Sequence, residues 1–203
     1  MPQTTSICES LIKQGISPDC ANPLIKGLEP DGVIINRSDI DFANCVVTGN
    51  VVSALVLKEG AWGYPVTQMG ATPFTGTQST MTSGTYRNTW QHNVAIAVLD
   101  NGPSVAENVI DALANGTFVV ILRNKFKGAD GRSEFQVYGY YQGLHASAID
   151  EDKYSEDLDG GWLVTLQETA SPKSAMFLWN QSYVNTKLIW DALFEGEGES
   201  EGE

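Results

Sequence analysis

The alternation of apolar and polar residues marks most of this chain as β-structure. Continuous runs of β-branched and aromatic residues, bounded by glycine and polar turns, are typical of buried strands. Such segments are 33–36, 45–57, 94–100, 117–123, 134–141, 161–168 and 176–180. Gly49 falls within the second of them and predicts a bend or bulge there. The pattern predicts an α+β, β-rich domain built as an antiparallel β-sandwich or a barrel-like sheet.

Two segments have helical rather than strand-like patterns. In the first, Ser104 and Glu107 have the spacing of a capping box, and Gly116 marks the end. The apolar residues on one face of this helix are Val105, Val109, Ile110 and Leu113. The second helix spans 183–194 and follows Ser182, a candidate N-cap. We therefore expect one central flanking helix and a C-terminal helix.

The organisation along the chain predicts one domain with appendages. In residues 1–30, a short helical stretch around 6–14 is followed by Pro18, Pro23 and Pro30, which indicates an N-terminal arm. A single β-rich assembly domain is expected over 31–195. Within it, 70–89 is rich in Thr, Ser and Gly and predicts a long loop or extended hairpin. The acidic, glycine-alternating residues 196–203 predict a disordered tail.

Composition narrows the possible partners. The 203 residues carry a formal net charge of −13, which disfavours tight binding to nucleic acid because phosphate contacts need Lys and Arg. The chain shows neither a signal peptide nor an apolar run long enough to cross a membrane, so we expect folding in a cytoplasm and no membrane partner. The three cysteines lack metal-site spacing and predict free thiols.

Recognisable catalytic chemistry is absent from the sequence. The acidic stretch that begins at Asp150 has Ser155 and Gly161 at the positions where an EF-hand needs glycine and glutamate. His92 and His145 lie outside known metalloprotease spacings, and phosphate-binding glycine loops are missing. We predict a non-enzymatic protein with neither cofactor nor catalytic residues. A looser calcium site stays open, as does a carbohydrate platform made by Trp62, Tyr64, Tyr86 and Trp90.

Charge is concentrated in two connections between strands. The basic connection contains Arg123, Lys125, Lys127 and Arg132, and the acidic one contains Asp150, Glu151, Asp152, Glu156, Asp157 and Asp159. If the strands 117–123, 134–141 and 161–168 form a meander, these connections lie at opposite ends of one sheet. Opposite charges at opposite ends suit head-to-tail association of identical subunits, so the ten residues are predicted to form an assembly interface. Two independent solvated loops, or an acidic wall along a DNA passage, are the alternatives.

A family resemblance adds to this interpretation. The Thr/Ser/Gly-rich loop is followed by the helix, the strand FQVYGYYQGL, the acidic loop and GGWLVTLQETASP, and the resemblance covers roughly 95–190. This order resembles the late half of the tail tube (major tail) proteins of bacterial viruses. The resemblance implies a virion protein, made in the host bacterial cytoplasm, whose β-sandwiches form rings, usually hexameric, that stack into a tube.

In that family the arm and the long loop reach neighbouring rings, and DNA passes through without tight binding. The partners implied are further copies of the chain and other virion proteins. A head-tail connector or a capsid accessory protein shares most of the same features. A carbohydrate-binding β-sandwich is the alternative from another functional class.

Overall fold

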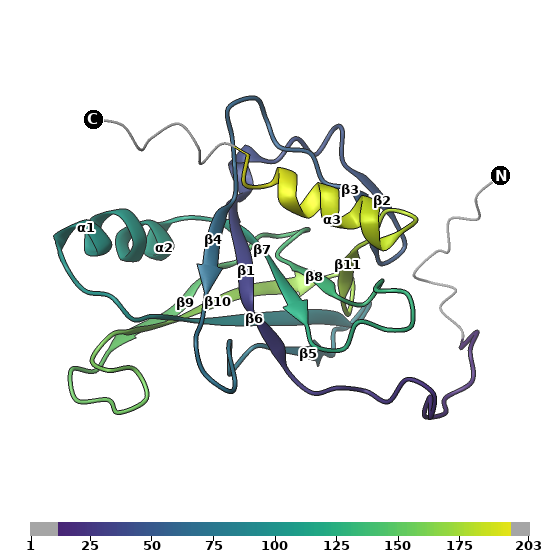
Figure 1. The fold of residues 1–203 in the computed structure, drawn as a ribbon, viewed down its shortest axis with the longest axis horizontal. Helices are drawn as coiled ribbons and strands as arrows, with labels where there is room; N and C mark the ends of the chain where they lie inside the picture. Colours follow the sequence, from purple (N-terminus) through teal and green to yellow (C-terminus); the bar gives the residue numbers. More distant parts are fainter. Residues whose placement is uncertain (1–11, 196–203) are drawn as a thin grey trace.

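Two stacked β-sheets and a covering helix make up the computed structural model, which describes residues 12–195 (Figure 1). The larger sheet has the order β2-β3-β11-β8-β7-β1-β4, with β1 (Leu28–Asn36), β2 (Val46–Thr48), β3 (Val51–Ala54), β4 (Tyr64–Thr67), β7 (Phe118–Asn124), β8 (Phe135–Tyr138) and β11 (Met176–Leu178). The smaller sheet has the order β5-β6-β10-β9, with β5 (Gln78–Thr82), β6 (Thr89–Val98), β9 (His145–Glu151) and β10 (Trp162–Ser171). The β-rich α+β sandwich is confirmed.

The central strands of the seven-stranded sheet are buried on both faces. In β7, Val119 and Ile121 point to one apolar cluster, and Val120 and Leu122 point to the other. The first cluster is closed by helix α3 (Tyr183–Ala192), and the second by β6 and β10 of the smaller sheet. Because both faces of β7 are covered, its sequence is continuously apolar instead of alternating.

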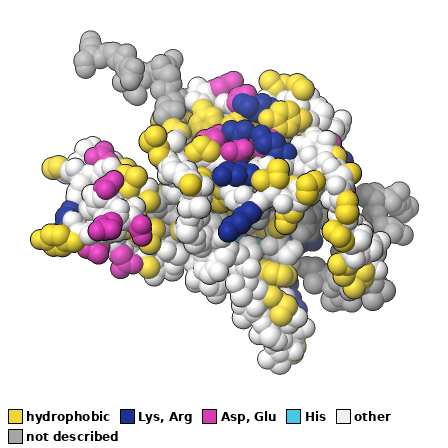
Figure 2. All heavy atoms as spheres, turned by 60° about the horizontal axis from the view of Figure 1, so that its bottom comes forward, with side chains coloured by type: hydrophobic (Ala, Val, Ile, Leu, Met, Phe, Trp, Pro, Cys, Tyr) yellow, Lys and Arg dark blue, Asp and Glu magenta, His cyan; other side chains and the backbone are white. Residues whose placement is uncertain are grey.

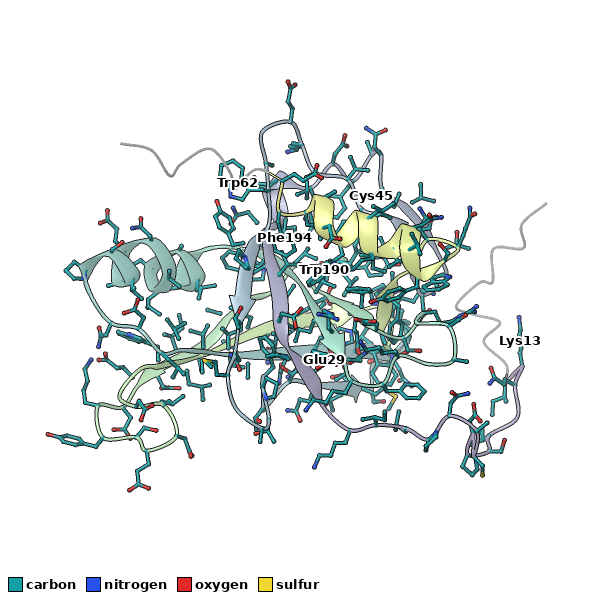
Figure 3. The ribbon with its side chains drawn as sticks, in the orientation of Figure 1. Lys13, Glu29, Cys45, Trp62, Trp190 and Phe194 are labelled. Carbon is teal, nitrogen blue, oxygen red and sulfur yellow. The ribbon has the colours of Figure 1, made fainter. Side chains whose placement is uncertain are left out.

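Helix α3 confirms the predicted C-terminal helix and its cap. Ser182 has an extended backbone, and its Oγ accepts a hydrogen bond of 3.1 Å from the Asn185 amide. Trp190 is buried against the larger sheet, with its ring centroid 5.0 Å from that of Phe135. Figure 3 shows Trp190 on the side of α3 that faces the strands.

The central helix forms as predicted, but in a less regular way. It consists of α1 (Pro103–Val105), a π-helical segment (η3, Ala106–Ile110) and α2 (Asp111–Asn115). The capping-box prediction was wrong, because the N-cap is Gly102 and the Ser104 hydroxyl accepts from the Asn108 side chain. Ile110 and Leu113 are buried as expected, whereas the wide π turn leaves Val109 37% exposed.

The meander predicted for the serial strands is wrong. β7 pairs with β8 in the larger sheet, but β10 lies between β6 and β9 in the smaller one. The chain crosses between sheets after β8, and the strand that carries it across, β9, was not predicted because only two of its seven side chains are partly buried. The acidic connection is therefore the loop of the β9–β10 hairpin.

Other boundaries also differ from the predictions. β1 begins at Leu28, inside the range expected for the arm, and 45–57 divides at Gly49 into β2 and β3. The range 70–89 contains β5, so the extended-hairpin alternative describes part of it. A 3₁₀ turn (η2, Arg37–Asp39) follows β1. Most of the helix expected around 6–14, and the tail 196–203, lie outside the described residues.

Candidate assembly surfaces

The acidic connection forms a projecting hairpin end. Asp150 and Glu151 are the last residues of strand β9, and the other four acidic residues follow in the loop; all six residues are exposed, although the Glu151 side chain is partly covered. Asp159 and Gly160 turn the chain back with left-handed backbone angles of φ 49° and 77°. Lys153 pairs with Glu151, which also accepts a hydrogen bond of 3.0 Å from the Asn101 side chain. The lobe at the left of Figure 2, where this hairpin lies, gathers acidic side chains.

The basic connection is neutralised within its own subunit. The Arg123 guanidinium donates to Glu134 Oε1 at 2.7 and 2.8 Å and also pairs with Asp31. Burial alone would lower the pKa of Arg123, but these two partners raise it overall. Lys127 Nζ lies 3.4 Å from Glu134 Oε1 and 3.9 Å from a carboxylate oxygen of Glu29.

Arg132 completes the internal pairing, since its Nε donates to Asp130 at 2.6 Å and lowers the pKa of that carboxyl. Lys125 makes no ion pair among the described residues, and its stem lies beside Gly27. Three of the four basic side chains thus face four carboxylates (Glu29, Asp31, Asp130 and Glu134), so the connection presents little net positive charge. The structure keeps the two charged groups apart, and their meeting across an interface stays a prediction.

The arm runs from residue 12 to residue 27 without helix or strand. Its hydrogen bonds within the described chain are local ones to Asp19 until Gly27, whose carbonyl accepts from the Lys125 amide at 3.0 Å. The large aliphatic side chains along it are uncovered: Ile12 82%, Ile16 91%, Leu24 81% and Ile25 55% exposed. A segment that exposes so much aliphatic surface gains free energy when a partner covers it.

The β5–β6 hairpin is a second projection. All residues from 78 to 88 are exposed, although β5 is regularly paired with β6 from Gln78 to Thr82. Met81 and Tyr86 are among them, so this ribbon buries none of its own apolar side chains fully. Apart from one hydrogen bond between the Ser79 hydroxyl and His92, this strand is held by its backbone hydrogen bonds, and its exposed edge is available to a neighbour.

An apolar groove opens between the two sheets on the side of the central helix. It has a volume of about 600 Å³ and lies between β4, the end of β6 and the helical segment 108–113. None of its lining residues is charged. The walls include Tyr64, Val66, Val98, Leu99, Val109 and Leu113. Tyr64 and Leu99 are 46% and 55% exposed, so the groove is open to solvent.

A buried carboxylate, which sequence reasoning did not single out, ties the sheets together. Glu168 of β10 is 2% exposed and accepts hydrogen bonds from the amides of Gly139, Tyr141 and Gln142, at 3.2, 3.2 and 2.8 Å. Gly139 has φ 81°, and a Cβ there would lie 2.6 Å from the Phe118 carbonyl oxygen. The carboxylate thus fixes the turn after β8. An acidic residue in an otherwise apolar strand pattern was the available signal.

Both histidines and two of the three cysteines lie within the described residues. His92 is buried between Lys173 and Ser79: its Nε2 donates to the Lys173 carbonyl at 2.9 Å, so its Nδ1 accepts from the Ser79 hydroxyl at 2.7 Å. His145 is exposed on β9. Among the described cysteines, Cys20 and Cys45 are free thiols. Within residues 12–195, no group of His, Cys, Asp and Glu side chains is arranged to hold a metal ion.

The proposed aromatic platform is divided between the sheets. Trp62 and Tyr64 lie together beside β4, with ring centroids 6.2 Å apart. Tyr86 and Trp90 belong to the β5–β6 hairpin of the smaller sheet. This division supplies no argument for carbohydrate binding.

Comparison of the chain with protein-family models, curated proteins and solved structures finds no match. None of the helices in the described residues is long and apolar enough to span a membrane.

Proposed function

We propose that this protein is a non-enzymatic structural subunit that assembles with copies of itself, most specifically into the tail tube of a bacterial virus. The main support for the proposal is the exposure of the arm 12–27, a segment without helix or strand whose aliphatic side chains are largely uncovered. The exposed β5–β6 hairpin supports the proposal independently, because its residues 78–88 are all exposed and contribute no buried side chain to the core. The sandwich between these projections supplies a rigid body.

The acidic hairpin has a second role in this proposal. Because the basic connection is already paired inside the subunit, an ion-pair interface is the weaker use for six exposed carboxylates. In a ring they form a wall that repels phosphates, so that DNA passes through without being held. This assigns the loop to the passage rather than to the contact between subunits.

Negative-stain electron microscopy of the concentrated protein tests the assembly. Rings that stack into tubes are the expected result. Single rings without stacking fit a head-tail connector better, and attachment only to a capsid fits an accessory protein. A protein that stays monomeric at the highest concentrations reached refutes the proposal.

A charge-removal variant tests the passage. Replacing Asp157→Asn and Asp159→Asn should leave assembly intact or strengthen it, while the assembled protein begins to retain double-stranded DNA. Lys125→Gln, which changes charge on the other connection, is the matched control and should change neither. Weaker assembly in the double variant, reversed by lower salt, would return the loop to the subunit interface.

A further inference from the structure

We propose that the apolar groove receives the arm of a second copy of this chain, with Ile16, Leu24 and Ile25 as the side chains that enter it. This inference rests on the proposed self-assembly and names its partner surfaces. The groove is the space of about 600 Å³ between β4, the end of β6 and the segment 108–113. The arm is residues 12–27.

The groove is built to hold something apolar. Its size is within the range of binding clefts, and its lining has no charged side chain. The π-helical segment supplies Asn108 and Val109 to one wall, and such segments occur often at functional sites. A second hollow, of about 530 Å³ beside the end of α3, includes Lys58 and Glu195 and is less suited to an apolar occupant.

The arm matches this surface in charge and chemistry. The stretch 20–25 carries no charge and contains Leu24 and Ile25, and 14–18 is likewise uncharged around Ile16. The charged residues of the arm, Lys13, Asp19 and Lys26, lie between or beyond these stretches and can stay in water. An occupant with charges at the contact would have to desolvate them without a partner in the groove.

The geometry favours a contact between copies. The arm joins the body at Leu28, the first residue of β1, while the groove is lined by Ile34 and Asn36 at the opposite end of that strand. Figure 3 shows Lys13 on the opposite side of the molecule from Trp62, which lies two residues before β4. The eleven residue-to-residue steps from Ile16 to Gly27 span about 36 Å when the chain is extended. The arm can thus cross to a neighbour.

Side-chain burial, more than strand addition, holds the arm in this arrangement. β4 is the edge of the larger sheet, but its Pro65 lacks a backbone donor. Because arm and groove are different surfaces, each copy offers both, and the contact propagates from head to tail into a closed ring or an open filament.

Three full-length variants test the contact. The arm variant is Ile16→Ser, Leu24→Ser and Ile25→Ser, and the groove variant is Leu99→Asn and Val109→Asn. The matched control is Val184→Ser and Leu188→Ser, on the outer face of α3, where both side chains are more than 60% exposed. Sedimentation should show association weakened at least a hundredfold in the first two, about tenfold or more for each aliphatic group lost, and unchanged in the control.

Mixing supplies the decisive measurement. The arm variant keeps a working groove and the groove variant keeps a working arm, so an equimolar mixture should form 1:1 dimers that grow no further. In an otherwise unaltered chain, a photo-crosslinking residue in place of Ile16 should attach to peptides from 64–67, 96–99 or 105–113 of another copy. This measurement does not depend on the folding of the groove variant.

The outcomes separate this inference from the proposed function. Tubes that form equally well from both variants, or crosslinks only to other peptides, would overturn the groove assignment and leave the assembly proposal standing. Mixed dimers from variants of a protein that never makes rings or tubes would overturn the tail tube proposal and leave the contact standing. A monomer under all conditions refutes both.

Discussion

Removing the Glu168 carboxylate should destabilise the fold more than any change to the acidic hairpin. The side chain is buried and is surrounded by three backbone donors, from Gly139, Tyr141 and Gln142. In Glu168→Ala these amides lose their acceptor. The turn after β8 then loses its link to β10, while six exposed carboxylates elsewhere contribute no comparable contacts.

The magnitude follows from the surroundings of the three amides. Hydrogen bonds to a charged group contribute roughly 1.5–3 kcal/mol each, but only the Gly139 bond is fully buried, and water can replace part of the other two. We expect Glu168→Ala to lower the free energy of unfolding by about 3–5 kcal/mol. Glu168→Gln keeps one oxygen and places an NH₂ group against a donor, so about 1–3 kcal/mol is expected.

Urea unfolding followed by tryptophan fluorescence measures the loss, with Glu156→Gln in the exposed loop as the control. Hydrogen exchange should show faster exchange at the Gly139 and Gln142 amides in Glu168→Gln. If Glu168→Ala unfolds within 0.5 kcal/mol of the unaltered protein, the carboxylate does not hold the turn and the reasoning fails.

Three further predictions follow from other parts of the structure. Ser182→Ala removes the α3 cap and should lower the free energy of unfolding by about 1 kcal/mol in the same urea assay; Ser182→Asp should restore it, and an unchanged midpoint in Ser182→Ala would contradict the cap. Burial raises the pKa of Tyr140 to about 12, so the folded protein keeps this proton while the unfolded chain loses it near pH 10. The free energy of unfolding should therefore fall between pH 10 and 12, and the ultraviolet absorbance of tyrosinate should show one group that ionises above pH 10. A single ionisation step at pH 10 would contradict this prediction. Trypsin should cut after Arg87, in the exposed hairpin turn, in free subunits but not in assemblies, and equal cleavage would remove the hairpin from the interface.

The sequence pattern identified elements better than their partners. The apolar run of β7 and the cap of α3 were visible because burial and capping act locally. The placement of β10 in the smaller sheet could not be predicted, because a strand has the same pattern of apolar residues whichever sheet it joins. β9 and β4 escaped prediction because their side chains are mostly exposed and β4 contains a proline.

The candidate surfaces show a similar division. The acidic residues could be found by counting charges, and their exposure agrees with a solvated loop. The ion-pair partners of Arg123 could not be predicted, because Asp31 lies in β1 and Glu134 lies just before β8, and only folding brings them to Arg123. The groove is lined by segments far apart in the sequence, from β1, β4, the end of β6, the central helix and the start of β7, which meet only on folding, so no short motif marks it.

The covering of the larger sheet on both faces has a consequence for how the chain folds. The central strands are covered only after β1, near the start of the described chain, has paired with β7, and after β11 and α3, near its end, have packed against the sheet. Roughly 150 residues separate β1 from α3 in the sequence. Such distant pairings make folding slow and leave little stable structure in a partly synthesised chain. Subunits would then become able to associate only after α3 has been synthesised. Assembly would therefore begin from completed chains and not from chains still on the ribosome.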